Sequence, residues 1–179
     1  MLLHGWIGEG KTATALASAD LLRGEGFRVL GVLSHRVVAG GAVKGYDLHD
    51  LGTGATAPLV RLREEAGEGW ESHGNPLYAF SAAGMEAGNR WLRDAAARLG
   101  LRTVVFADEY GGLEERGLGL YMGITAVADA LHRGGAAVVT VRTSRVPDAE
   151  RLLSPRAERA VVIHAGSPEA VAREIMDRS

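Results

Sequence analysis

The stretch Gly5-Trp6-Ile7-Gly8-Glu9-Gly10-Lys11-Thr12 decides the fold of this 179-residue chain. It matches the pattern G-x-x-x-x-G-K-[ST], whose glycines let successive backbone N–H groups curl around an anion. A short apolar run, Met1 to His4, precedes it. The apolar positions that follow have the spacing of one helix face: Ala15, Leu16, Ala19 and Leu22. This order of strand, glycine-rich turn and helix is typical of a phosphate-binding loop.

We expect this loop to bind a nucleotide. The predicted contacts come from Gly5, Trp6, Ile7, Gly8, Glu9, Gly10, Lys11, Thr12 and Ala13. The Lys11 ammonium would reach the β- and γ-phosphates, and the Thr12 hydroxyl would bind Mg²⁺. The chain has 20 basic residues, and only Lys11 and Lys44 are lysines. The position of a lysine inside this loop is therefore informative.

A second motif lies at the end of a predicted strand. The run Arg102 to Ala107 is rich in β-branched residues and is followed by Asp108 and Glu109. In parallel sheets, such strand ends line the edge where ligands bind. We expect Asp108 to hold Mg²⁺ together with Thr12, and Glu109 to orient or deprotonate an attacking water.

The rest of the chain alternates predicted strands and helices. Strands are expected at Phe27–Leu33, Leu77–Ser81, Ala136–Val141 and Ala160–His164, and helices at Met85–Leu99, Ile124–His132, Pro147–Leu153 and Pro168–Met176. This alternation predicts a single α/β domain over residues 1–179, with a mostly parallel sheet flanked by helices in three layers. Between about residues 35 and 63, glycine-separated runs predict an antiparallel β-hairpin or meander inserted after the second strand. Polar residues 64–76 indicate a mobile surface loop.

Composition excludes several classes of protein. The formal net charge of −2 lacks the positive field of a nucleic-acid-binding protein. No cysteine is present, which excludes disulfides and cysteine-based metal sites. We see neither a secretory signal nor a run of ~20 apolar residues. We therefore expect a cytoplasmic protein whose partner is a nucleoside triphosphate, with no nucleic acid or membrane partner.

The motifs and their order resemble the small P-loop nucleoside-triphosphatases first described from thermophiles, a family that includes the cancer-related NTPase type. The resemblance covers nearly the whole chain and rests on the stretches 5–12, 31–36, 45–51, 105–114 and 139–142. It implies a P-loop NTPase fold with a β-hairpin insertion. It also implies slow, Mg²⁺-dependent hydrolysis of the γ-phosphate of ATP, GTP or other nucleoside triphosphates.

The acidic motif departs from the family at one position. The family pattern is similar to D-E-I-G-K-M-E, and this chain has Gly112 at the lysine position. Because guanidinium groups suit phosphate recognition, an arginine could supply the missing charge. The candidates are Arg142, Arg145 and Arg116, of which we assign Arg142 to the catalytic set with Lys11 and Glu109.

Two other functions stay open at this stage. A nucleotide or small-molecule kinase would use the same loop with a different phosphate acceptor. A P-loop binding or switch module for molybdenum-cofactor assembly is the other alternative, because the stretch Gly31 to Arg36 also resembles the GTP-binding accessory proteins of molybdopterin dinucleotide synthesis. No Asn/Thr-Lys-x-Asp guanine signature is present, which disfavours strict GTP specificity.

Overall fold

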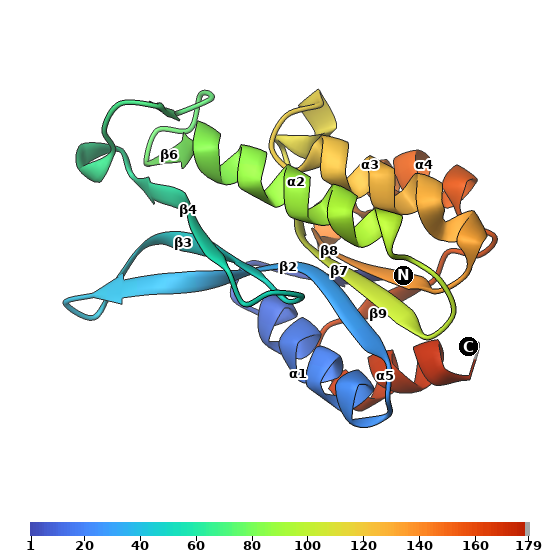
Figure 1. Ribbon diagram of the computed structural model, residues 1–179. Coiled ribbons are helices and arrows are strands. Elements are labelled where there is room, and N and C mark those ends of the chain that lie inside the picture. The colour runs from blue at the N-terminus through green and yellow to red at the C-terminus, as the bar shows by residue number, and fades with distance from the viewer. Residues whose placement is uncertain (178–179) are drawn as a thin grey trace.

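The computed structural model describes residues 1–177, in which nine strands form one sheet of order β5-β6-β4-β3-β2-β7-β8-β1-β9. The strands are β1 Leu2–Gly5, β2 Arg28–Ala39, β3 Ala42–Asp50, β4 Thr56–Leu62, β5 Trp70–Glu71, β6 Tyr78–Ser81, β7 Thr103–Tyr110, β8 Ala136–Arg142 and β9 Val162–His164. The helices are α1 Lys11–Gly24, α2 Ala82–Ala97, α3 Tyr121–Ala130, α4 Val146–Leu153 and α5 Pro168–Met176. Helices α2, α3 and α4 cover one face of the sheet, and α1 and α5 cover the other (Figure 1). The expected three-layer α/β fold is confirmed.

A parallel core of five strands, β2-β7-β8-β1-β9, holds the phosphate loop. Strand β7 lies between β2 and β8 and is buried over Thr103–Asp108, as a parallel strand covered on both faces should be. Because the carboxyl ends of parallel strands meet at one edge, Gly5, Asp108 and Arg142 lie near the same edge of the sheet. The fold therefore brings the two predicted motifs together.

The antiparallel part of the sheet is larger than expected. Strand β2 continues past Leu33 and pairs antiparallel with β3, which pairs with β4, so the insertion extends the main sheet (Figure 1). Strand β6 pairs with β4, and β5 pairs with β6. The prediction of a loop throughout residues 64–76 is wrong at Trp70–Glu71, because these form β5. A two-residue strand is too short to show an alternating pattern.

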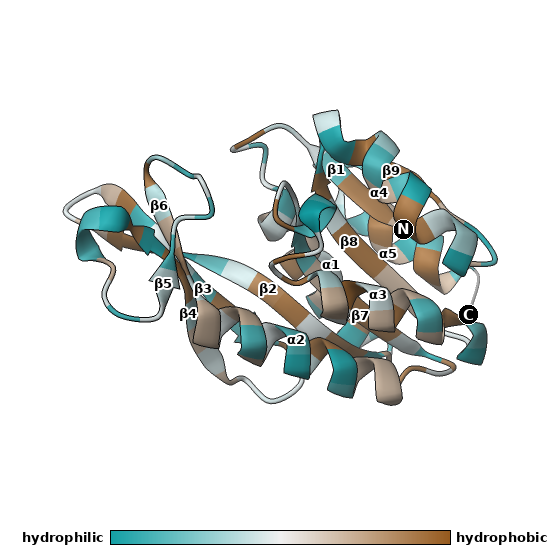
Figure 2. Cartoon of the chain, turned by 90° about the horizontal axis from the view of Figure 1, so that it is seen from above, coloured by the Kyte–Doolittle hydropathy of each residue, from teal (hydrophilic) through white to brown (hydrophobic). Residues whose placement is uncertain are grey.

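Two apolar layers hold the helices against the sheet. Adjacent residues of a strand point to opposite faces, so Val105 packs with Leu92 and Ile124 in the α2–α3 layer, while Phe106 packs with Leu22 in the α1–α5 layer. Figure 2 shows these hydrophobic residues concentrated along the central strands, with hydrophilic residues on the outer surface of α2. The inner side of α2 carries the buried Leu92 and Ala95. No helix of residues 1–177 is long and apolar enough to cross a membrane.

We predict that Leu92→Ala lowers the free energy of unfolding by ~2–5 kcal/mol, because it removes a fully buried side chain and leaves a cavity. The matched control is Leu101→Ala, whose side chain is 82% exposed and should change stability by less than ~0.5 kcal/mol. Urea unfolding of both variants measures the difference. Equal losses in the two variants would contradict this packing.

Candidate active site

The phosphate loop has the backbone geometry of an anion site. Gly10 has φ +78°, a conformation that suits glycine, and it immediately precedes α1. The first intrahelical bond runs from Thr14 N to Gly10 O at 2.8 Å. The amides of residues 11–13 therefore have no acceptor within the helix, and they point out of its positive end. Such a helix end is suited to binding phosphate.

Lys11 lies over this loop. Its Nζ donates to Gly5 O at 3.2 Å and to Trp6 O at 3.0 Å. The two carbonyls hold the ammonium beside the first glycine of the motif. Trp6 and Ile7 are 58% and 77% exposed, so neither side chain serves to fill the core. Their indole and alkyl groups instead border the loop.

Glu9 stabilises the phosphate loop on the side that faces β9. Its Oε2 accepts from Trp6 N at 2.8 Å and lies 3.3 Å from His164 Nε2. The His164 ring meets His4 edge-on, with centroids 5.0 Å apart, and partial burial lowers the pKa of His4. The side chain of Glu9 therefore helps to fix the shape of the phosphate loop.

Asp108 is the most constrained group of the site. The residue belongs to β7 and is only 3% exposed. Its Oδ2 accepts from Thr12 Oγ1 and from Ser34 N, both at 2.9 Å, and its Oδ1 accepts from Thr140 Oγ1. Burial raises the pKa of Asp108, and these hydrogen bonds oppose that rise. Elements α1, β2, β7 and β8 thus converge on one carboxylate.

The oxygen atoms around Asp108 fit a magnesium ion. Carboxylate and hydroxyl oxygens are the ligands that Mg²⁺ takes from proteins, together with water and substrate phosphates. Among the ion pairs of residues 1–177, none includes Asp108, so no basic side chain of these residues lies within ion-pair distance of its carboxylate. Sequence reasoning missed Ser34 and Thr140. A threonine inside the apolar run Ala136–Val141 was the one available signal.

Glu109 and Arg142 form an ion pair at the same sheet edge. Arg142 Nε lies 2.8 Å from Glu109 Oε1, and the two side chains are 47% and 42% exposed. The pairing of β7 with β8 is irregular between Ala107 and Tyr110, where Glu109 lies. Arg142 is the register partner of Gly5. Glu109 and Arg142 are thus in contact with each other at the sheet edge that holds Gly5, whose carbonyl binds Lys11, and the catalytic roles of the three residues stay predictions.

The other two candidate arginines have different surroundings. Arg145 pairs with Glu115, and its Nη2 lies 4.0 Å from the point where a Gly112 side chain would begin. Arg116 donates to the carbonyls of Gly112 at 3.0 Å and His73 at 3.2 Å. Both arginines therefore lie beside Gly112, with Arg145 paired to a carboxylate and Arg116 bound to main chain.

Glu114 anchors the loop between β7 and α3, a role that sequence reasoning did not find. The residue is 6% exposed, and its carboxylate accepts from Gly111 N and Leu120 N, both at 2.9 Å. A Cβ at Gly119 would overlap Glu114 Oε1, so this position requires glycine. Burial raises the pKa of Glu114 to about 7. Its carboxylate fixes the backbone two residues after Glu109.

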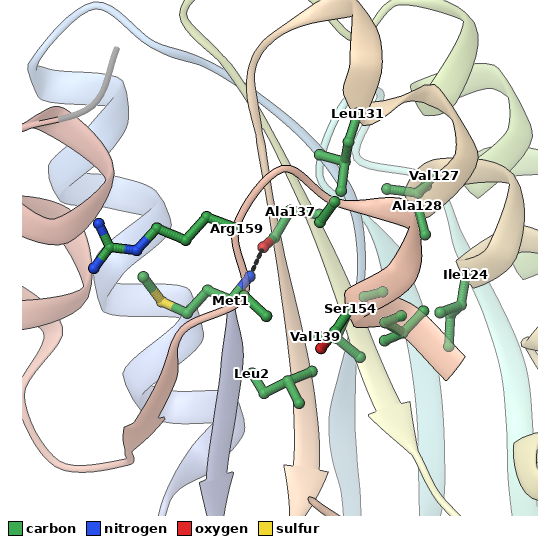
Figure 3. A pocket seen from close by; sticks show the side chains of 14 residues that line it. Met1, Leu2, Ile124, Val127, Ala128, Leu131, Ala137, Val139, Ser154 and Arg159 are labelled. Carbon is green, nitrogen blue, oxygen red and sulfur yellow. Dashed lines mark hydrogen bonds between the residues drawn. The ribbon is translucent and has the colours of Figure 1, made fainter. Parts of the chain in front are cut away.

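An apolar pocket lies away from these residues. Figure 3 shows its lining from β1, β8, α3 and the segment 153–160, including Leu2, Val139 and Ile124. Met1 N donates to Ala137 O at 2.8 Å beside it. This is the opposite edge of the sheet from Gly5 and Arg142, the last residues of the same two strands. The pocket therefore adds no group to the site.

A parallel α/β core with a glycine-rich loop between β1 and α1, and an acidic strand end nearby, defines a P-loop nucleotide-binding fold. The family model described as NTPase matches residues 1–176. The chain belongs to this NTPase family, and is thereby a member of an enzyme family.

Named relatives agree with this assignment. The nucleoside-triphosphatase THEP1 of Thermofilum pendens is 32% identical over 113 residues, which are 63% of this chain and 58% of that protein, so the match spans less than two thirds of that relative. The nucleoside-triphosphatase THEP1 of Pyrobaculum calidifontis is 29% identical over 150 residues, 84% of this chain and 77% of that protein. The solution structure of a human cancer-related nucleoside triphosphatase superposes with a TM-score of 0.68 and 25% identity, covering 99% of this chain and 93% of that one.

We predict that Glu114 makes stability fall as pH rises. Its pKa is raised from 4.5 to about 7 on folding, so the folded state binds the proton more tightly. The contribution of Glu114 to the free energy of unfolding is complete below pH 4.5 and is lost above pH 7, a change of ~3 kcal/mol. Glu114→Gln should abolish this part of the pH dependence in urea unfolding between pH 4.5 and 7.5. Exposed Glu86→Gln is the control, and identical pH profiles for wild type and Glu114→Gln would contradict the assignment.

Proposed function

We propose that the protein hydrolyses the γ-phosphate of nucleoside triphosphates with Mg²⁺. The observation that carries this proposal is the 2.9 Å contact between Thr12 Oγ1 and Asp108 Oδ2, directly beside the open amides of the phosphate loop. It joins the two motifs that phosphoryl transfer from a nucleotide requires. Membership of the NTPase family supports the same chemistry.

The phosphate loop and the start of α1 would bind the nucleotide. The amides at the start of α1 and the Lys11 ammonium would hold the phosphates, with the remaining loop residues Gly5 to Gly10 curled around them. Thr12 and Asp108 would hold Mg²⁺ through their hydroxyl and carboxylate groups. The ion, when bound, neutralises charge on the β- and γ-phosphates.

Glu109 would act as the general base in hydrolysis. Its carboxylate would accept a proton from a water whose oxygen attacks the γ-phosphorus in line. The new P–O bond forms as the bond from the γ-phosphorus to the β–γ bridging oxygen breaks, which leaves a nucleoside diphosphate and inorganic phosphate. Arg142 would stabilise the negative charge on the transferred group.

We infer that the substrate range is broad and includes ATP and GTP. The contacts assigned above go to phosphates and metal, which all nucleoside triphosphates share. The sequence carries no guanine-reading signature. Discrimination between bases should therefore be weak.

We predict that Lys11→Ala abolishes binding of a nucleoside triphosphate, because it removes the ammonium that faces the phosphates. Calorimetric titration with Mg²⁺ and a non-hydrolysable triphosphate measures this. The matched control is Lys44→Ala, the other lysine, which pairs with Glu65 in the hairpin region at 2.9 Å and should bind like wild type. Equal affinity of Lys11→Ala and wild type would refute the site.

We predict that Glu109→Gln keeps nucleotide binding while phosphate release falls by ~10²–10⁴-fold, since glutamine cannot accept the proton. The assay is release of inorganic phosphate from four nucleoside triphosphates, with and without Mg²⁺. Wild-type rates in Glu109→Gln would contradict the role. In wild type, a phosphorylated acceptor in place of free phosphate would indicate a kinase, and tight binding without turnover would indicate an accessory module.

A further inference from the structure

The side chains of Glu109 and Arg142, both assigned to hydrolysis, bind each other. Glu109 must face a water to accept its proton, and Arg142 must face a phosphate to stabilise its charge. Instead, Arg142 Nε donates to Glu109 Oε1 at 2.8 Å. While the guanidinium covers Oε1, that oxygen is not open to a water, and the guanidinium is not open to a phosphate. The ion pair thus engages both groups in a contact that neither proposed role uses.

The position of Arg142 gives it access to a second partner. It ends β8, which lies between β7 and β1 in the sheet. Its register partner is Gly5, whose carbonyl already binds the Lys11 ammonium at 3.2 Å. Neighbouring strands are ~4.8 Å apart, which is less than the length of an arginine side chain. Arg142 therefore stands between Glu109 and the phosphate loop.

We propose that Arg142 exchanges partners during the reaction: it binds Glu109 in the free protein and the γ-phosphate oxygens of a bound nucleoside triphosphate. The inference rests on the proposed function, and it adds how that site is switched on. A triphosphate would draw Arg142 to its γ-phosphate and leave both carboxylate oxygens of Glu109 free to face a water. Release of phosphate lets the pair form again.

The strength of the contacts favours this exchange. Both side chains are more than two fifths exposed, and ion pairs this exposed are weak. A γ-phosphate carries more charge than a carboxylate and offers bidentate acceptors to a guanidinium. A diphosphate lacks that group. The exchange should therefore distinguish triphosphate from diphosphate.

Neighbouring arginines are held differently. Arg145 binds Glu115, and Arg116 binds two backbone carbonyls. Neither contacts the proposed base. Arg151 forms an exposed ion pair with Asp148 at 2.9 Å, and serves as a matched reference for a pair outside the site.

The test is ¹⁵N NMR of arginine Nε–H groups in the full chain. Arg142→Lys and Arg151→Lys assign the two resonances. We expect the Arg142 resonance to shift with Mg²⁺ and the β,γ-imido analogue of ATP, and to stay near its free position with ADP. In nucleotide-free Glu109→Gln it should already differ from wild type. The Arg151 resonance should not move in any state.

Affinity gives a second readout. Arg142→Ala should weaken binding of the imido analogue by ~10–100-fold, the size expected for losing charge-assisted hydrogen bonds, while ADP affinity changes by less than ~2-fold. An equal shift of the Arg142 resonance with ADP, or no shift with the analogue bound, would overturn the exchange. Failure of wild type to bind the analogue at all would instead overturn the proposed function beneath it.

Discussion

The buried carboxylate of Asp108 is the constraint on which the site depends. A carboxylate that is 3% exposed is costly to keep unless its oxygens are hydrogen-bonded. The donors come from three separate elements, through Thr12, Ser34 and Thr140. Satisfying one side chain therefore fixes the start of α1 against β2 and β8. The phosphate loop is held in place as a consequence.

Two adjacent carboxylates have opposite environments. Asp108 is enclosed by donors, whereas the Glu109 side chain is 42% exposed and reaches Arg142. The two side chains lie where the pairing of β7 with β8 is irregular, and there one carboxylate is in the interior and the other is at the surface. A fixed group suits metal binding, and an accessible group suits proton transfer. Glu114 then anchors the loop that follows β7, which holds the end of this strand in place.

Sequence patterns predicted what depends on local order. The glycine-rich motif located β1 and α1, and the apolar run before Asp108 located β7. Patterns did not reveal Ser34 and Thr140 as partners of Asp108, because that contact depends on β2 and β8 flanking β7. Strand order is a property of the whole sheet.

Other differences have equally local causes. Strand β5 has two residues, which form no periodic pattern. The role of Glu114 depends on backbone amides, which every residue except proline carries and which leave no trace in the sequence. The sequence offers three candidate arginines. Only the register of β8 with β1 shows that Arg142 is the one beside Gly5. Sequence reasoning could name the residue types needed but not their neighbours.

The most direct measurement is a crystal structure of the protein with Mg²⁺ and a non-hydrolysable nucleoside triphosphate. We expect phosphates along the amides of residues 8–13, with the metal beside Thr12 and Asp108. A nucleotide bound elsewhere, with the loop after β1 empty, would contradict this expectation.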